Sequence, residues 1–303
     1  MLTAQGFNEI WSNSLTKTSY YENNSVYPIE SAVKLFNPLS NDLGSMRQTL
    51  LYGGLESIAH NANRKNPDLR LYEFGNCYYF NGSSLKENPI MNYREDEHLA
   101  LYISGEKEAA NWSSPAIKTT FFLLKSYVEN ILKRMGFDVL NLKSEGFSNE
   151  LCADGLQYLI NGKKLVKFGA ISGKTLKGFN IENPVYFADF NMDNLFIELK
   201  NNKVVFVELP KYPEVRRDLA LMLDKTVQFN QLRNLAFRSE RKLLQSVDLF
   251  DVYEGKGVPE GKKSYAISYI LRDDEKTLND KQIEKIMQKL VSTYERELGA
   301  QLR

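Results

Sequence analysis

Residues 279–299 read NDKQIEKIMQKLVSTYERELG, and this stretch decides how the end of the chain folds. Asn279, followed three residues later by Gln282, forms a capping box that supplies partners for the free N–H groups of a helix start. Gly299 is the residue type that most often ends a helix. Apolar side chains between these signals recur at the spacing of one helix face: Ile283, Ile286, Met287, Leu290, Tyr294 and Leu298. The stretch therefore predicts an amphipathic helix over Asn279–Leu298.

Strands and a second helix precede this helix in an order that defines a small domain. The predicted elements are a strand at Arg217–Asp224, a helix at Gln228–Ser239, strands at Leu243–Glu254 and Lys263–Asp273, and a short last strand at Ala300–Arg303. With the helix at Asn279–Leu298 between the last two strands, this is the order of a split βαβ, ferredoxin-like βαββαβ module. We assign this domain to residues 210–303.

Residues 1–209 predict an α+β domain with a largely antiparallel sheet. Ser45 and Gln48 form a capping-box pattern before a helix of about four turns that reaches Ala62. Asn161-Gly162 is a strong signal for a tight hairpin turn between two strands. The other predicted elements are a helix at Thr119–Met135 and strands at Arg70–Phe80, His98–Ser104, Gln157–Asn161, Lys164–Ile171, Val185–Asn191 and Val204–Glu208. Hairpins of this kind indicate antiparallel strands covered by helices.

Composition excludes several classes of protein. The 303 residues are 43% hydrophobic and 25% charged, as in ordinary folded proteins, and suffice for two domains. No apolar run approaches the roughly 20 residues of a membrane span, and no export signal is visible, so we expect a cytoplasmic protein without a membrane partner. Cys77 and Cys152 are expected to be buried free thiols, and the two histidines, His60 and His98, have no nearby ligand cluster that predicts a metal site.

The net charge gives only a local hint of a polyanionic partner. The whole chain carries a formal charge of +1, whereas residues 210–303 hold 18 Lys and Arg against 15 Asp and Glu, an excess of three positive charges. A nucleic-acid surface would therefore be confined to part of the C-terminal domain, although a solvated surface explains this modest excess about as well.

Four ordered blocks of the C-terminal domain carry a family resemblance. They are Pro210–Leu219 (PKYPEVRRDL), Phe250–Gly255 (FDVYEG), Lys263–Ala266 (KSYA) and Thr277–Asp280 (TLND). Together they resemble the ferredoxin-fold anticodon-binding domain of bacterial phenylalanyl-tRNA synthetase β subunits. Upstream, Asn37–Ser40 (NPLS), Met46–Leu51 (MRQTLL) and Leu71–Gly75 (LYEFG) resemble the class II synthetase-like core of the same subunit.

The resemblance implies a function for each domain. Residues 1–209 would be a non-catalytic core that scaffolds the catalytic α subunit in an α2β2 heterotetramer, and residues 210–303 would bind the anticodon region of phenylalanine tRNA. The holoenzyme would attach phenylalanine to its tRNA using ATP and Mg²⁺, with no cofactor held by this chain. Because β subunits of this family are longer, residue 1 is expected to mark a truncation. The alternative is a free-standing RNA-binding or protein-interaction module.

Catalytic chemistry is poorly supported by the residues themselves. Adenylate formation spreads negative charge over phosphates and requires fixed arginines, yet Arg70 and Glu73 are spaced differently from the Arg-x-Glu core of the second class II motif. No arginine occurs between Arg134 and Arg216, where the third motif would fall. The stretch Gly169–Thr175 resembles a phosphate-binding loop but is one residue short, so we predict a simple turn with an exposed Lys174. We predict no catalytic residues.

The candidate tRNA-binding residues lie in the C-terminal domain. Open ferredoxin-like sheets stack unpaired bases on aromatic side chains while Lys and Arg neutralise phosphates. The cations Arg216, Arg217, Lys262 and Lys263 and the rings of Tyr253 and Tyr265 are predicted to serve these two roles. Two alternatives stay open at this point: Tyr265 could face the helices as core, and Arg217 could pair with Asp218 or Glu214.

Overall fold

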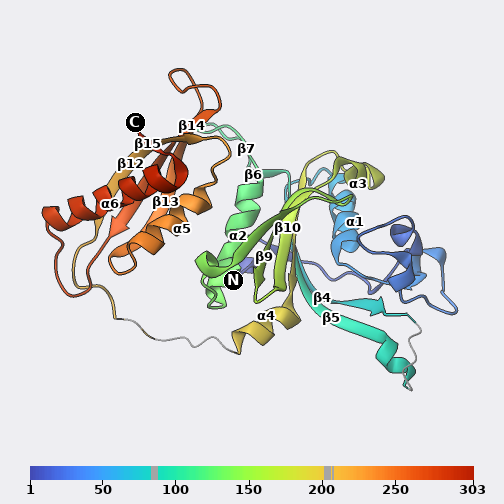
Figure 1. Cartoon of the computed structure of the whole chain (residues 1–303). Coiled ribbons are helices and arrows are strands. Elements are labelled where there is room, and N and C mark those ends of the chain that lie inside the picture. Colours follow the sequence, from blue (N-terminus) through green and yellow to red (C-terminus); the bar gives the residue numbers. More distant parts are fainter. Residues whose placement is uncertain (83–87, 201–205, 207) are drawn as a thin grey trace. The chain divides into compact units, whose positions relative to one another are not determined.

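A computed structural model describes residues 1–82, 88–200, 206 and 208–303 of the chain, shown in Figure 1. The chain divides into two compact units, Met1–Val204 and Val205–Arg303. The sequence predicted a boundary after residue 209. The strand predicted at Val204–Glu208 falls largely outside the described residues.

A seven-stranded sheet forms the centre of the first unit. Its order is β1-β4-β5-β11-β10-β9-β8, and every neighbouring pair is antiparallel except β1 with β4. The strands are β1 (Asn8–Glu9), β4 (Leu69–Phe80), β5 (Tyr93–Ser104), β8 (Lys143–Phe147), β9 (Cys152–Ile160), β10 (Lys163–Ile171) and β11 (Val185–Asn191). The predicted antiparallel sheet is confirmed.

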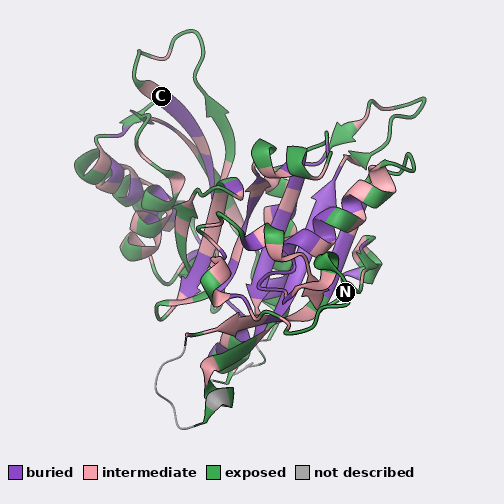
Figure 2. Cartoon of the chain, turned by 90° about the vertical axis from the view of Figure 1, so that its right-hand side faces the viewer, coloured by how far each residue is buried: buried purple, intermediate pink, exposed green. Residues whose placement is uncertain are grey.

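Elements packed on both faces of this sheet create two cores. Leu99, Leu101 and Ile103 of β5 pack with α2 (Phe121–Arg134) and α4 (Met192–Leu199) on one face. Ala100 and Tyr102, which alternate with them, pack with α1 (Leu51–Ala62) and α3 (Gly173–Gly178) on the other, which we call the α1 face. The central strands are accordingly buried, as the purple ribbon of Figure 2 shows.

Local signals succeeded at a hairpin and failed at a helix start. Asn161 and Gly162 have φ angles of 51° and 79°, the left-handed values that a tight turn between β9 and β10 requires. The helix predicted from Ser45 begins only at Leu51, however, because Ser45 belongs to strand β3 (Ser45–Met46). The Ser45 hydroxyl lies 2.7 Å from that of Thr18 and is not used to cap a helix.

The second unit has the predicted ferredoxin-like topology. Its four-stranded sheet has the order β13-β14-β12-β15, and helices α5 and α6 cover one face. The elements are β12 (Val215–Asp224), α5 (Phe229–Ser239), β13 (Leu244–Tyr253), β14 (Lys262–Leu271), α6 (Asp280–Leu298) and β15 (Gln301–Leu302). The predicted capping box at Asn279 and Gln282 is present, and Gly299 ends α6 at a φ of 61°. The face opposite the helices carries no covering element among the described residues.

Short elements and the cysteines complete the description. The remaining strands are β2 (Leu15–Thr16), β6 (Glu106–Glu108) and β7 (Ile117–Lys118), and the 3₁₀ helices are Thr3–Gln5, Thr18–Tyr21, Ile29–Ser31, Asn41–Leu43, Pro89–Asn92 and Val139–Asn141. Cys77 and Cys152 are free and buried, as predicted. Within the described residues, each helix is too short or too polar to cross a membrane.

Candidate nucleic-acid interface

Strand alternation and register decide which predicted residues reach the open face of the second unit. Leu221 and Leu223 of β12 point to the core beneath the helices, so Arg216, which alternates with them, points to the open face. Neighbours in register, such as Asp224 with Lys262, share a face. Tyr253 of β13 pairs with Ser264 and lies on the open face as well.

Two aromatic rings of β13 are exposed, and each lies beneath an arginine. The Tyr253 ring is 38% exposed and lies 5.2 Å from the guanidinium of Arg303, measured to the ring centroid. Phe250 is 54% exposed and lies 5.4 Å from the guanidinium of Arg216. A guanidinium that lies over a ring covers that face, so a base stacks there when the arginine moves aside to a phosphate. Proteins that bind single-stranded RNA commonly combine aromatic rings and cations in one surface.

Carboxylates neutralise the two arginines at the start of β12. Arg216 Nε lies 2.9 Å from Oδ1 of Asp218, on the open face. Arg217 points to the helix side, where its Nη2 lies 3.7 Å from Oδ1 of Asp280 at the first turn of α6. The ion pair anticipated for Arg217 therefore exists, with Asp280 in place of Asp218 or Glu214. Both arginines are half-exposed, so their pairs are weak and exchangeable.

The structure separates Lys262 from the other two residues predicted on β14. Lys262 is on the open face, 3.6 Å from Asp224. Tyr265 is 7% exposed and belongs to the core beneath the helices, so it offers no stacking surface on the open face. Lys263 shares that side, is 8% exposed, and donates from Nζ to the Lys225 carbonyl at 2.9 Å. For Tyr265 the core alternative is correct, because odd-numbered positions of β14 face the helices.

Other exposed cations escaped prediction from the sequence. Arg303, which lies over Tyr253, becomes a candidate only through the sheet register, which places the last strand beside β12. The Phe250 ring, which lies under Arg216, was likewise not predicted. A further group lies on and just after α5 and along α6, exposed and without an ion pair within the described part of the chain: Arg238, Arg241, Lys242, Lys285 and Lys289. Their clustering could not be read from the sequence because it depends on the packing of α5 against α6.

In the first unit, Arg70 and Glu73, the residues compared with the second class II motif, are already engaged within the chain. Arg47 and Glu73 are buried, and Arg47 Nη1 lies 2.7 Å from Glu73 Oε1. Arg70 lies on the opposite side of β4 from Glu73, because three positions along a strand reverse the face, and it donates to the carbonyls of Gln5 and Lys107. These three side chains are therefore not free to bind the phosphates of a nucleoside triphosphate, and the described residues contain no cluster of metal-ligating groups.

A second charge network lies on the same face of the sheet as Glu73. Asp189 contacts His98 Nδ1 at 2.6 Å and Lys167 Nζ at 3.3 Å, and Lys167 also donates to the Tyr27 hydroxyl at 2.6 Å. Burial disfavours the charged form of His98, but the Asp189 carboxylate outweighs burial and raises the histidine pKa above its usual value. Burial likewise opposes ionisation of Asp189, and its two cationic neighbours reverse that effect and lower its pKa.

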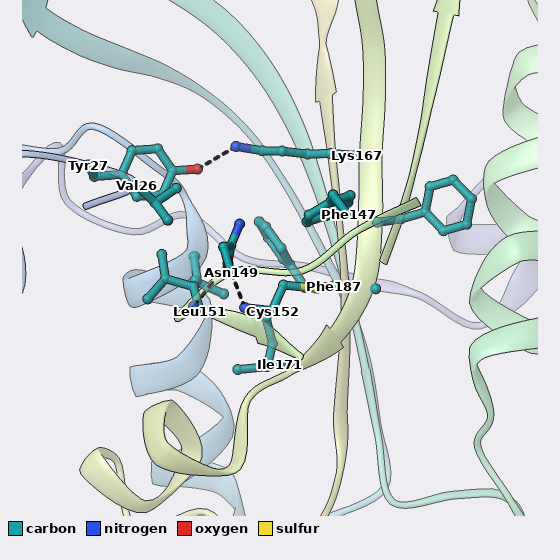
Figure 3. A pocket seen from close by; sticks show the side chains of 12 residues that line it. Val26, Tyr27, Phe147, Asn149, Leu151, Cys152, Lys167, Ile171 and Phe187 are labelled. Carbon is teal, nitrogen blue, oxygen red and sulfur yellow. Dashed lines mark hydrogen bonds between the residues drawn. The ribbon is translucent and has the colours of Figure 1, made fainter. Parts of the chain in front are cut away.

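The space beside this network is small and mostly apolar. Figure 3 shows the hydrogen bond from Lys167 to Tyr27 at the edge of a cavity. The cavity has a volume of about 30 Å³ and is also lined by Val26, Phe147 and Phe187. Such a volume has room for about one water molecule and not for a nucleotide.

The stretch resembling a phosphate-binding loop forms a different structure from the predicted turn. Residues Gly173–Gly178 are the short helix α3, and the Ser172 side chain accepts a hydrogen bond from the Thr175 N–H. The helix start is thus capped by the chain itself. The strand before it, β10, runs antiparallel to both neighbours, so the parallel unit that supports a phosphate loop is missing here.

Comparisons with known proteins agree with this architecture. Residues 1–192 match the family model of the phenylalanyl tRNA synthetase beta chain CLM domain, and residues 210–303 match that of the ferredoxin-fold anticodon binding domain. An antiparallel core joined to an anticodon-binding module defines a chain of the aminoacyl-tRNA synthetase class. More narrowly, the chain belongs to the phenylalanyl-tRNA synthetase beta chain family.

Individual relatives show how much of such a protein is present. The chain is 50% identical over 306 residues to the phenylalanine-tRNA ligase beta subunit of Bacteroides thetaiotaomicron and 49% identical over 304 residues to that of Porphyromonas gingivalis. Both alignments cover all of this chain and 37% of the relative. A solved pyrrolysyl-tRNA synthetase from Desulfitobacterium hafniense is 14% identical, covers 66% of each chain and has a TM-score of 0.49.

Proposed function

We propose that this chain is the non-catalytic part of a phenylalanine-tRNA ligase β subunit, which scaffolds a catalytic α subunit and binds the anticodon region of phenylalanine tRNA. The ligase attaches phenylalanine to that tRNA with ATP in the cytoplasm, as an α2β2 assembly. ATP and Mg²⁺ act on the α subunit in this proposal, because Arg47 and Arg70 are engaged within this chain. The observation that carries the RNA role is the pair of exposed rings on the open face of the second unit.

Stacking explains why this face suits an anticodon loop. Loop bases are unpaired, and each base placed on an aromatic ring contributes about 1–3 kcal/mol of binding free energy. Tyr253 and Phe250 provide two such rings on one strand, and Arg303 and Arg216 lie over them. Carboxylates such as Asp218 balance the charge of the face, so base contacts contribute more of the binding than phosphate contacts do.

Exposed apolar side chains support the proposal that the first unit binds a partner subunit. Trp11, Phe36 and Leu39 of the first unit are 95%, 97% and 94% exposed. Side chains of this size are rarely left wholly in water, and they are enriched at the centre of protein interfaces. The first unit thus has exposed apolar side chains suited to an interface with a second synthetase subunit. A free-standing RNA-binding module would not require such an interface.

The RNA role is tested with the full-length β subunit assembled with its α subunit. Tyr253→Ala is expected to weaken binding of phenylalanine tRNA by about 10-fold or more, from the loss of one stacked base. Tyr212→Ala is the matched control, since Tyr212 is 37% exposed but lies outside the strands of this sheet. Equal affinities for the two variants would refute the assignment of the open face.

The scaffolding role has a separate test. Full-length β subunit is expected to co-purify with its α subunit, and neither subunit alone should charge tRNA. If the two failed to associate while tRNA binding persisted, the free-standing module would be the correct description.

A further inference from the structure

A hollow of the first unit, lined by strand residues and by the first turn of α4, has no role in the proposed function. It measures about 220 Å³ and lies over β10 and β11 beside the start of α4. Six polar residues contribute to its lining: His98, Lys164, Lys167, Asp189, Asn191 and Asn194. It is distinct from the apolar cavity near Tyr27, although Lys167 borders both.

His98 is the most unusual of these residues. Its side chain is 9% exposed, and its Nδ1 is held 2.6 Å from Asp189. Its Nε2 is also buried, yet no described group forms a hydrogen bond with it. A buried ring nitrogen without a partner is costly, so such an atom at the wall of a hollow indicates that something else satisfies it.

The other polar groups around the hollow leave mainly donors free. Both Asp189 oxygens are engaged, by His98 and by Lys167. Asn191 uses its side-chain oxygen to accept from the Asn194 N–H, which leaves its amide N–H₂ available. The Lys164 ammonium is exposed and has no ion pair among the described residues. With the Nε2–H of charged His98 added, the unused donors are an imidazolium, an ammonium and an amide. The Asn194 side chain donates to the Lys164 carbonyl, so its amide oxygen adds one acceptor.

We propose that this hollow binds a compact oxyanion, either a phosphate group or a carboxylate. Two lysines and His98 lie around Asp189, and Asp96, the other carboxylate that acts on His98, forms an ion pair with Arg94. The site therefore carries a net positive charge that a single anion would offset. The raised pKa of His98 supports this assignment, because the charged ring presents Nε2–H as a donor. Asp189 does not repel the anion strongly, since both of its oxygens face cations. The volume suits a compact group and is smaller than the cavities that hold most drug-sized ligands.

The experiment uses the two histidines of the chain, His98 and His60, as site and internal control. The 303-residue chain is labelled with ¹⁵N-histidine and titrated with inorganic phosphate, sodium acetate or sodium chloride while both ring signals are followed by NMR. We expect a saturable shift of the His98 Nε2 signal, with the exposed His60 unchanged. Saturation by phosphate alone assigns a phosphate site, and saturation by acetate assigns a carboxylate site.

Variants keep the test decisive. Lys164→Met is expected to lower the affinity for the anion at least about 10-fold, because one charge-assisted contact is lost. Lys177→Met removes another exposed lysine, on α3 and outside the hollow, and should leave the affinity unchanged. The proposal is overturned if no anion gives a saturable His98 shift, if chloride reproduces the effect as an adventitious ion only, or if the two lysine variants behave alike.

Discussion

The buried Arg47–Glu73 pair allows a quantitative prediction for the first unit. Glu73 is 0% exposed, and its other contacts are the N–H and hydroxyl of Ser12, each at 3.0 Å. Arg47→Met removes the cation and leaves the carboxylate buried, a change that costs about 3–5 kcal/mol. It also removes the Nε donor 2.9 Å from the Asn76 carbonyl. We therefore expect the free energy of unfolding of the first unit to fall by the upper part of that range.

The assay must separate the two units, because one global transition cannot be assumed for a chain that divides in two. Hydrogen exchange measured by mass spectrometry in increasing urea does so, with peptides from β5 for the first unit and from α6 for the second. A loss of 4 kcal/mol corresponds to about a 1000-fold rise in the open population of the first unit, by the rule that 1.4 kcal/mol is tenfold. Peptides of α6 serve as the internal reference.

Two further variants make the result interpretable. Arg64→Met removes an exposed arginine and should change stability by no more than about 0.5 kcal/mol. In Arg47→Met with Glu73→Leu, no unpaired buried charge remains at this position, so the double variant should be more stable than the single Arg47 variant. It should not recover fully, because the Ser12 donors then lose their acceptor. A cost below about 1 kcal/mol for Arg47→Met would refute the reasoning that Glu73 depends on this cation.

Two other predictions concern single positions. Gly54→Ala places a Cβ against Cε1 of the buried Tyr102 ring and should destabilise the first unit by about 1–3 kcal/mol or more. Gly178→Ala, which has open space around it, is the control and should be neutral or slightly stabilising. Both are measured in the same urea titration. Asn279→Ala removes the side chain that accepts from the Gln282 N–H and should cost the second unit about 1 kcal/mol, measured from the exchange of α6 peptides; an unchanged midpoint would show that the cap does not stabilise that helix.

The sequence predicted elements best where one local signal agreed with the next. The last helix combined a capping box, an apolar stripe and a terminal glycine, and the structure has it at Asp280–Leu298. Ser45 and Gln48 gave the same capping signal without being used, because tertiary contacts took both side chains: Ser45 pairs with Thr18, and Gln48 donates to the Pro28 carbonyl. A capping pattern shows that a helix could start at that position. Whether it does depends on tertiary contacts with residues far away in the sequence.

The candidate sites depended even more on information outside the local sequence. Tyr253 and Tyr265 looked equivalent, yet strand phase places one on the open face and the other in the core. Arg303 over Tyr253 required the register of the last strand. The network of His98, Lys167 and Asp189 joins residues up to 91 positions apart, and no spacing rule connects them. Assignment of the β12 cations to tRNA stays a prediction.

The shortness of β15 has a consequence for how the second unit avoids self-association. β15 pairs only with Leu221 and Met222 of β12, and the Arg303 N–H adds one bond to the Ala220 carbonyl. The first half of β12 is therefore an edge strand on that side, and such edges recruit strands from other copies unless they are protected. Three consecutive charges, Arg216 to Asp218, occupy this edge. Whatever they contribute to RNA binding, they also act as gatekeepers against β-sheet aggregation.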